Sequence, residues 1–185
     1  MKGQFDEDQW LGSLHSFPTV LHARGSLSFD ISPASLQKAL VSALSSLRES
    51  QISTRITVAD QDGYLDGSAH FKIGIGNGEG FDILDAKEAG RILDRIENRG
   101  AFDSLDLAVQ IHYSINDGRR HKIHQDRYVI RLIFQPGRVE ALIHHLKGIR
   151  RVDPAELIEL IMAQLNTVLS REKFPEVFFD LVTST

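Results

Sequence analysis

The sequence predicts an α+β domain, with a mainly antiparallel sheet of about five strands and helices packed on one face. Two observations lead to this class. Segments of alternating apolar residues follow one another in pairs joined by Asp-Gly turns, so neighbouring strands are expected to be antiparallel. Segments with apolar residues three and four positions apart begin after Ser or Asp caps, so they are expected to be helices. The resulting order is β-α-β-β-α-β-β-α-α.

Composition supports a single domain with its own core. The chain has 185 residues, of which 42% are hydrophobic and 25% charged, as in ordinary globular proteins. It has no cysteine, which excludes disulfides, thiol nucleophiles and cysteine zinc sites. The acidic start contains no secretory signal, and no apolar run approaches the ~20 residues of a membrane span. We therefore expect a cytoplasmic protein that does not enter a membrane.

We divide the chain into a polar leader (1–16), one α+β domain (17–173) and an apolar tail (174–185). The tail is rich in valine and phenylalanine and would be an exposed apolar patch if it stayed in water. We therefore expect it to dock on its own domain or on a partner subunit.

The first half of the domain contains three strands and two helices. Alternating apolar residues predict a strand at 19–31. Ser32 and Pro33 then suit the N-cap and first turn of a helix that reaches residue 50. Segments 52–59 and 64–75 read as a hairpin closed by Asp62-Gly63. Asp85 and Glu88 form a capping pattern for a helix through about residue 98.

The second half begins with a long hairpin at 104–134, whose arms meet at Asn116-Asp117-Gly118. Pro136 ends the second arm. Apolar residues at Val139, Leu142, Ile143 and Leu146 then predict a short helix over 138–147, closed by Gly148. Asp153-Pro154 opens a last helix that reaches about residue 171.

Charge is unevenly distributed along the chain. Residues 60–88 contain seven acids against two lysines, whereas residues 119–151 contain nine lysines and arginines against two acids. These regions could neutralise each other or simply face solvent. Alternatively, the basic region could bind an anionic partner.

The leading functional hypothesis is a non-catalytic binding domain that uses a projecting basic hairpin, 115–131. Its partner would be an anion, either nucleic acid or an acidic protein surface, because arginine bonds phosphate and carboxylate bidentately. The expected anion-binding residues are Arg119, Arg120, Lys122, His124 and Arg127.

Two alternatives use other residues. The glycine-rich loop 74–80 and the carboxylates near it could form a metal-dependent enzyme or a small-ligand site, with Asp60, Asp62, His70 and Asp82 as ligands. The loop does not match a dinucleotide-binding or P-loop motif, and no catalytic motif is present, so we assign no cofactor, no metal site and no catalytic residue. In the other alternative, the basic hairpin meets the acidic region of a second copy, which gives a homo-oligomer.

Overall fold

The computed structural model of the chain describes residues 10–57, 63–115, 117–119, 123 and 125–182. Within them lie eight strands and three helices. The elements are β1 (Ala23–Ser28), α1 (Pro33–Glu49), β2 (Gln51–Thr57), β3 (Tyr64–Gly76), β4 (Phe81–Ile83), α2 (Ala86–Arg99), β5 (Ser104–Ile115), β6 (Asp126–Gln135), β7 (Arg138–Lys147), α3 (Pro154–Arg171) and β8 (Phe179–Val182).

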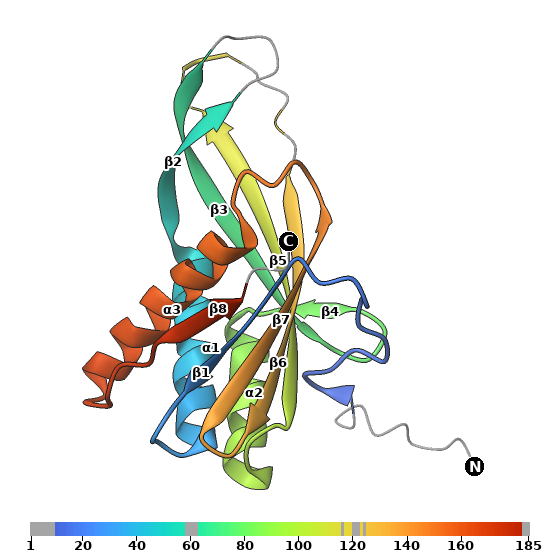
Figure 1. Cartoon of the computed structure of the whole chain (residues 1–185), viewed down its shortest axis with the longest axis vertical. Helices are drawn as coiled ribbons and strands as arrows, with labels where there is room; N and C mark the ends of the chain where they lie inside the picture. The colour runs from blue at the N-terminus through green and yellow to red at the C-terminus, as the bar shows by residue number, and fades with distance from the viewer. Residues whose placement is uncertain (1–9, 58–62, 116, 120–122, 124, 183–185) are drawn as a thin grey trace.

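The strands form one antiparallel sheet in the order β2-β3-β5-β6-β7-β1-β8, and β4 pairs with β3 outside this path. The α+β class is therefore confirmed (Figure 1). The sheet is larger than the predicted five strands because three strands were not expected. These are the short β4, the tail strand β8, and β7.

The helix predicted over 138–147 is wrong, because this segment is strand β7. Val139, Ala141 and Ile143 alternate toward the core and are fully buried, whereas the side chain of Leu146 is 56% exposed. The apolar positions fit both a helical and a strand period, and the turn before them decides. Pro136 and Gly137, with Gly137 at φ +71°, make a two-residue turn that returns the chain alongside β6.

The three predicted helices that remain are confirmed, and their caps form as the sequence indicates. Ser32 accepts a hydrogen bond from the backbone N–H of Ser35, and Asp85 accepts one from Glu88. A complete capping box joins Asp153 and Glu156 at the start of α3. None of the described helices has the length and apolar character needed to cross a membrane.

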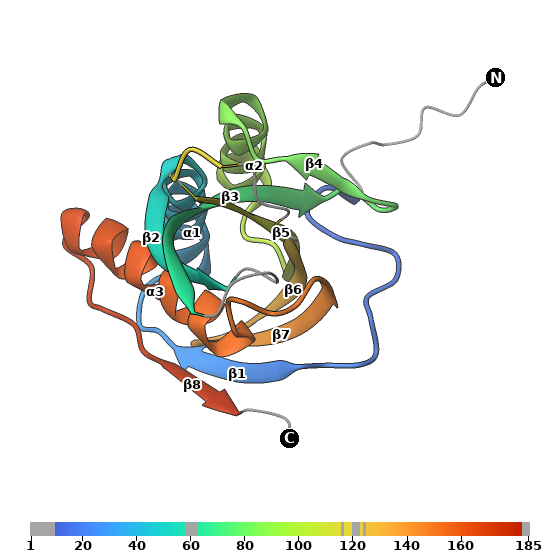
Figure 2. The same ribbon diagram turned by 90° about the horizontal axis from the view of Figure 1, so that it is seen from above.

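Helices α1 and α3 lie on the concave side of the curved sheet, with α2 beside α1 (Figure 2). The core lies between these helices and the sheet, so this face of the sheet is apolar. Its principal members are Leu36, Leu40, Leu44, Ile158, Ile161 and Leu165 from the helices and Phe71, Ile73, Val109, Ile130 and Ile143 from the strands.

The C-terminal segment lies on the chain's own sheet. β8 pairs with β1, and Gly25 allows this approach because a Cβ at that position would lie 2.3 Å from the ring of Phe179. The side chain of Asn166 also holds the backbone of Val177 through two hydrogen bonds of 2.9 Å.

Candidate anion-binding face

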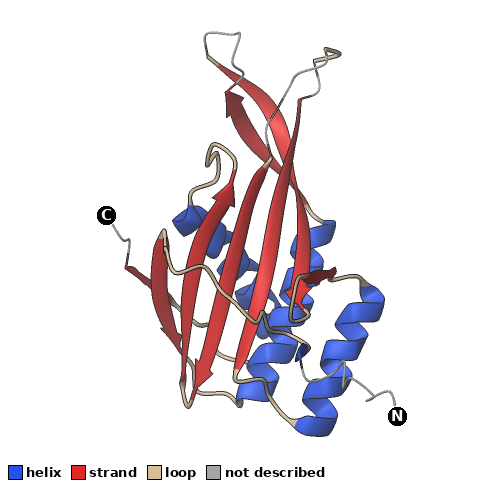
Figure 3. Ribbon diagram, turned by 90° about the vertical axis from the view of Figure 1, so that its right-hand side faces the viewer, coloured by secondary structure: helices blue, strands red, loops and turns tan. Residues whose placement is uncertain are grey.

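The two faces of the sheet differ in polarity because side chains alternate along each strand. The inner face packs on the helices. The outer face carries polar and charged side chains, and a segment of chain near the N-terminus crosses part of it (Figure 3). This segment, residues 10–17, is called the strap below, and it divides the outer face into a covered half and an open half.

In the covered half, the strap is fixed by backbone hydrogen bonds to two strands. The N–H of Gly12 donates to the carbonyl of Gly76 on β3, and the N–H of Asp106 on β5 donates to the carbonyl of Gly12, both at 2.7 Å. The backbone N–H of Leu14 donates to the carboxylate of Asp106, also at 2.7 Å. The strap is therefore part of the folded domain.

An ion pair between a buried carboxylate and a half-buried arginine lies beneath the strap. Asp106 is fully buried, and Arg131 donates to both of its carboxylate oxygens at 2.7 Å. The guanidinium also donates to the carbonyl of Leu14 and lies 4.7 Å from the centre of the Phe17 ring. The hydrogen bonds to Asp106 raise the pKa of Arg131 above its usual value. All these contacts are internal, so Arg131 has a structural role.

In the open half, a row of side chains crosses four neighbouring strands. Lys72 on β3 pairs with Gln110 on β5, Gln110 pairs with Arg127 on β6, and Arg127 pairs with Lys147 on β7. Lys72, Arg127 and Lys147 are all exposed. Three strand spacings give the row a length of about 14 Å. We call these four residues the cationic row.

The cationic row contains no compensating carboxylate. None of the ion pairs found in the described residues includes Lys72, Arg127 or Lys147. Arg127 and Lys147 also lie directly opposite each other, and like charges in this position destabilise a sheet. The row therefore concentrates positive charge at a cost to folding.

A pair of histidines lies beside the row. His70 on β3 is the register partner of His112 on β5, and Ser114 Oγ lies 3.4 Å from His70 Nε2. Nε2 of His112 is buried and has no hydrogen-bond partner among the described residues. Burial lowers the pKa of His112, and the positive charges of Lys72 and Arg127 lower it further.

A groove opens at the end of the row, where β6 and β7 part. Its volume is about 450 Å³, and its lining combines two cations with an amide, a glycine and two isoleucines. The lining residues are Ile123, Gln125, Arg127, Lys147, Gly148 and Ile149. Gln110 of the row donates a hydrogen bond to the side chain of Gln125, which links the row to the groove.

A buried carboxylate holds the wall of the groove in place. Asp126 is fully buried and accepts hydrogen bonds from Tyr113 Oη at 2.6 Å and from the backbone N–H groups of Arg150 and Arg151, both at 2.8 Å. Gly148 passes so close that a Cβ there would lie 2.1 Å from Asp126 Oδ1. Its φ of +113° also favours glycine. The loop after β7 is thus fixed against the base of the hairpin.

The residues predicted from the basic hairpin have separate positions. Arg127 belongs to the cationic row and lines the groove. Arg119 is exposed near the turn, where its N–H donates to the side chain of Asp117. Arg120, Lys122 and His124 lie outside the described residues, so their part in binding stays a prediction. The sequence did not single out Lys72 and Lys147, because only the strand register brings them into one row with Arg127.

The residues of the alternative ligand site are not brought together where they are described. Asp60 and Asp62 lie outside the described residues. Asp82 pairs with Ile75, five residues beyond His70 along β3, which is about 17 Å in a strand. The carboxylate of Asp82 accepts a hydrogen bond from Asn77. Within the part of the chain that the structure describes, no group of three or more His, Asp or Glu side chains could hold a metal ion.

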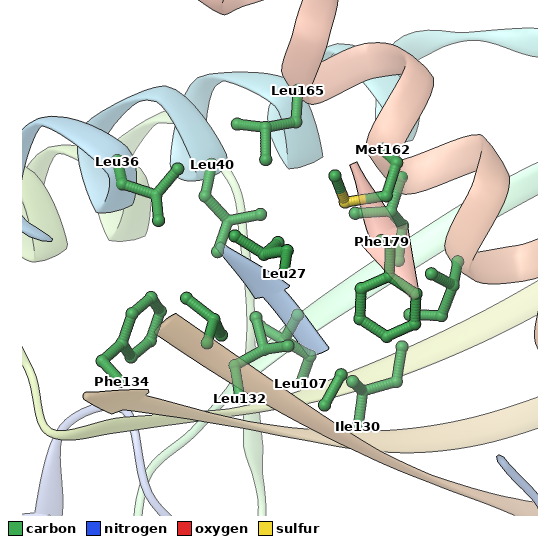
Figure 4. Close-up of a pocket in the computed structure, with 14 residues that line it drawn as sticks. Leu27, Leu36, Leu40, Leu107, Ile130, Leu132, Phe134, Met162, Leu165 and Phe179 are labelled. Atoms are coloured by element: carbon green, nitrogen blue, oxygen red, sulfur yellow. The ribbon is translucent and has the colours of Figure 1, made fainter. Parts of the chain in front are cut away.

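An apolar pocket lies on the other side of the sheet, between its inner face and helices α1 and α3 (Figure 4). Its free volume is about 30 Å³, far below the roughly 300 Å³ at which pockets begin to hold small organic ligands. Leu40, Leu107, Ile130, Met162 and Phe179 are among the side chains that line it, and none of the lining residues is polar. It is a packing gap in the core that is too small for an organic ligand.

The open half of the outer face therefore offers fixed positive charge, amide donors and a groove. These groups can bind an anion through charge-assisted hydrogen bonds. Comparisons with protein-family models, curated proteins and solved structures find no match to this chain.

Proposed function

We propose that this chain is a non-catalytic domain that binds the backbone of a nucleic acid on the open half of its outer sheet face. The cationic row would contact phosphates, and the projecting hairpin would extend the contact through Arg119. Backbone contacts of this kind give affinity without reading the sequence of the bases.

The observation that carries this proposal is the pairing of Arg127 with Lys147, with Lys72 in the same row. Opposed cations cost stability, and such local conflicts are expected where function requires them. An anion placed between the two side chains would turn their repulsion into two attractive contacts. Binding thus removes a cost that folding alone leaves in place.

A polymer fits the row better than a small anion. Three cations spread over about 14 Å cannot all contact one phosphate, but they can contact several phosphates along one chain. Gln110, which lies between Lys72 and Arg127, and the exposed His70 beside the row add groups that hydrogen-bond to phosphate or sugar oxygens. The geometry therefore supports a linear polyanion that lies across the strands.

Fluorescence anisotropy with a labelled 12-nucleotide DNA tests this proposal. We expect the triple variant Lys72→Gln, Arg127→Gln, Lys147→Gln to lose on the order of 100-fold in affinity, because three phosphate contacts disappear. The logarithm of the wild-type association constant should fall with the logarithm of salt concentration, and these three contacts should contribute a slope of roughly −2.1 for a single strand.

A matched control removes the same charge from the helices. Lys87 on α2, Arg171 at the end of α3 and Lys173 just after it are exposed and take part in none of the ion pairs found among the described residues. Changing all three to Gln should leave affinity within a factor of about three, since long-range charge is screened by salt. Equal losses in both triple variants would show a general charge effect and contradict the proposal.

A further inference from the structure

We propose that the groove between β6 and β7 receives one unpaired base of a single-stranded nucleic acid, while Arg127 and Lys147 hold the adjoining phosphate. This inference rests on the proposed function and names the form of the polyanion. The evidence for it is the shape and the partly apolar lining of the groove. The binding of phosphates by the cationic row would require neither of these features.

The groove has a suitable size and position. Its volume of about 450 Å³ falls within the range of pockets that hold small organic ligands. It begins at Arg127 and Lys147, the last pair that joins β6 to β7, so a phosphate on the row would bring its nucleoside to the groove. A bare row of cations would need no such hollow.

The lining suits a base as well as a phosphate. Ile149 is 58% exposed although its side chain is wholly apolar, and Ile123 is the second aliphatic residue of the groove. A flat base can cover such a side chain and remove its surface from water. The amide of Gln125 and the backbone of Gly148 offer hydrogen-bonding groups to the polar edges of the base.

Only an unpaired base could enter. In a duplex, the bases are stacked and paired, so the phosphates reach the row but no base face reaches the groove. The exposed aromatic residues of the described chain, Trp10, Tyr64 and Phe178, do not line the groove. The isoleucines would therefore make the apolar contact that aromatic side chains make in many single-strand binders, with less energy and little preference among bases.

The wall of the groove that follows β7 is held in place before binding. Asp126 fixes the loop after β7 through three hydrogen bonds, and Gly148 packs directly against it. A site that is already ordered does not lose additional conformational entropy when it binds. The wall that carries Ile149 is thus part of the rigid domain.

An anionic membrane is the competing partner, because Leu146 is also exposed beside Lys147 and apolar residues next to cations suit a lipid surface. A concave groove fits a nucleotide better than the broad surface of a bilayer. We therefore assign the groove to a nucleic acid and include vesicles in the test.

The test measures the binding of three oligonucleotides of equal length. It also compares serine variants of two exposed isoleucines, one in the groove and one outside it. The ligands are a labelled 12-nucleotide single strand, the same strand with abasic sites in place of its bases, and the corresponding duplex. We expect the intact single strand to bind about fivefold more tightly than the abasic strand, the factor for shielding on the order of 40 Å² of apolar surface. Ile149→Ser should remove this difference.

Ile83→Ser is the matched control, because Ile83 is 61% exposed on β4 and lies outside the groove. This variant should keep the fivefold preference. Methyl NMR of the wild-type protein gives a second readout that does not depend on a variant: a bound base should shift the Ile149 methyl signals through its ring current, and the Ile83 signals should stay unchanged.

The outcomes separate this inference from the proposed function. Equal affinity for the intact and abasic strands, tighter binding to the duplex, or equal effects of the two serine variants would overturn the groove assignment while polyanion binding stands. If no oligonucleotide binds, or if only vesicles containing phosphatidylserine bind, both the groove assignment and the proposed function fail.

Discussion

Two arginines on one strand differ completely in what surrounds them. Arg127 and Arg131 lie four residues apart on β6 and face the same outer side of the sheet. Arg131 bonds both oxygens of Asp106 and is covered by the strap. Arg127 lies opposite Lys147 and forms no ion pair with any described residue.

The difference arises from the residue that each arginine meets on β5. Asp106 is the register partner of Arg131, whereas Gln110 is the partner of Arg127. A carboxylate directly opposite a guanidinium removes its charge from the surface and adds fixed hydrogen bonds. An amide in the same place leaves the charge available. The same residue type thus becomes structural or available for binding according to its cross-strand neighbour.

The two buried carboxylates show a parallel contrast. Asp106 bonds a guanidinium, whereas Asp126 accepts from a neutral hydroxyl and two backbone N–H groups. Asp126 therefore orders a loop, and the ion-pair contact of its carboxylate, at 3.5 Å, is with the mostly buried His145 and not with a surface cation. Burial and the hydrogen bond to Asp126 raise the pKa of Tyr113 well above its usual value, so this hydroxyl keeps its proton at all ordinary pH values.

The largest expected effect on stability comes from removing the ion pair in the covered half of the outer face. Arg131→Met should lower the free energy of unfolding by about 3 kcal/mol, because it leaves the charge of Asp106 buried without its partner. Urea denaturation at pH 7, followed by circular dichroism, measures this change.

Arg127→Met is the control, since it makes the same substitution four residues away on the same face. We expect its free energy of unfolding to stay within about 0.5 kcal/mol of wild type, with a small gain if repulsion from Lys147 is relieved. A loss at Arg127 as large as that at Arg131 would mean that both arginines are structural and would end the contrast.

A smaller effect is expected at the carboxylate behind the groove. Asp126→Asn should cost about 2 kcal/mol of unfolding free energy, because an amide cannot accept all three hydrogen bonds and one donor loses its partner. The same urea titration measures it. Full stability in this variant would show that the loop holding Ile149 is not anchored by the carboxylate.

Local signals in the sequence were enough to predict most of the fold. Caps such as Ser32 and Asp153 depend on near neighbours in the chain, and the structure contains them. The antiparallel pair predicted within 104–134 also forms, although its second strand begins at Asp126 and not at Arg119. The sequence predicts a helix in place of β7 because its apolar residues suit two periods and Pro136 before Gly137 is as typical of the end of a strand as of a tight turn. Tertiary pairing with β6 and β1, which the sequence does not display, decided between the periods.

The candidate site was harder to predict for a related reason. Arg127 was found because it lies in a basic stretch of sequence, but Lys72 comes from an acidic region and Lys147 from a segment that was expected to be helical. A register shift next to Arg127 brings Lys147 opposite it. One-residue changes of register alter which side chains meet, so a site made across four strands depends on information that is not local.

The smallest expected effect is a dependence of binding on pH, which belongs to the open half alone. His112 lies opposite His70 and two residues along the strands from the cationic row, and its pKa is lowered by burial and by the charges of Lys72 and Arg127. Without ligand, His112 therefore binds a proton more readily in the unfolded state than in the folded state. The free energy of unfolding should fall as pH falls below about 6.5.

Bound phosphates should act on the pKa of His112 in the opposite direction. By offsetting the charges of Lys72 and Arg127, they raise the pKa of His112, so that binding takes up protons and affinity rises by about threefold as pH falls from 7.5 to 5.5. Anisotropy titrations at several pH values measure the rise, and His112→Gln should flatten it. Burial also lowers the pKa of His22, which lies beside His144 and His145. Because the His112→Gln variant keeps His22, a flattened pH profile in that variant can be attributed to His112. The same rise in the variant would mean that His112 does not sense the bound anion.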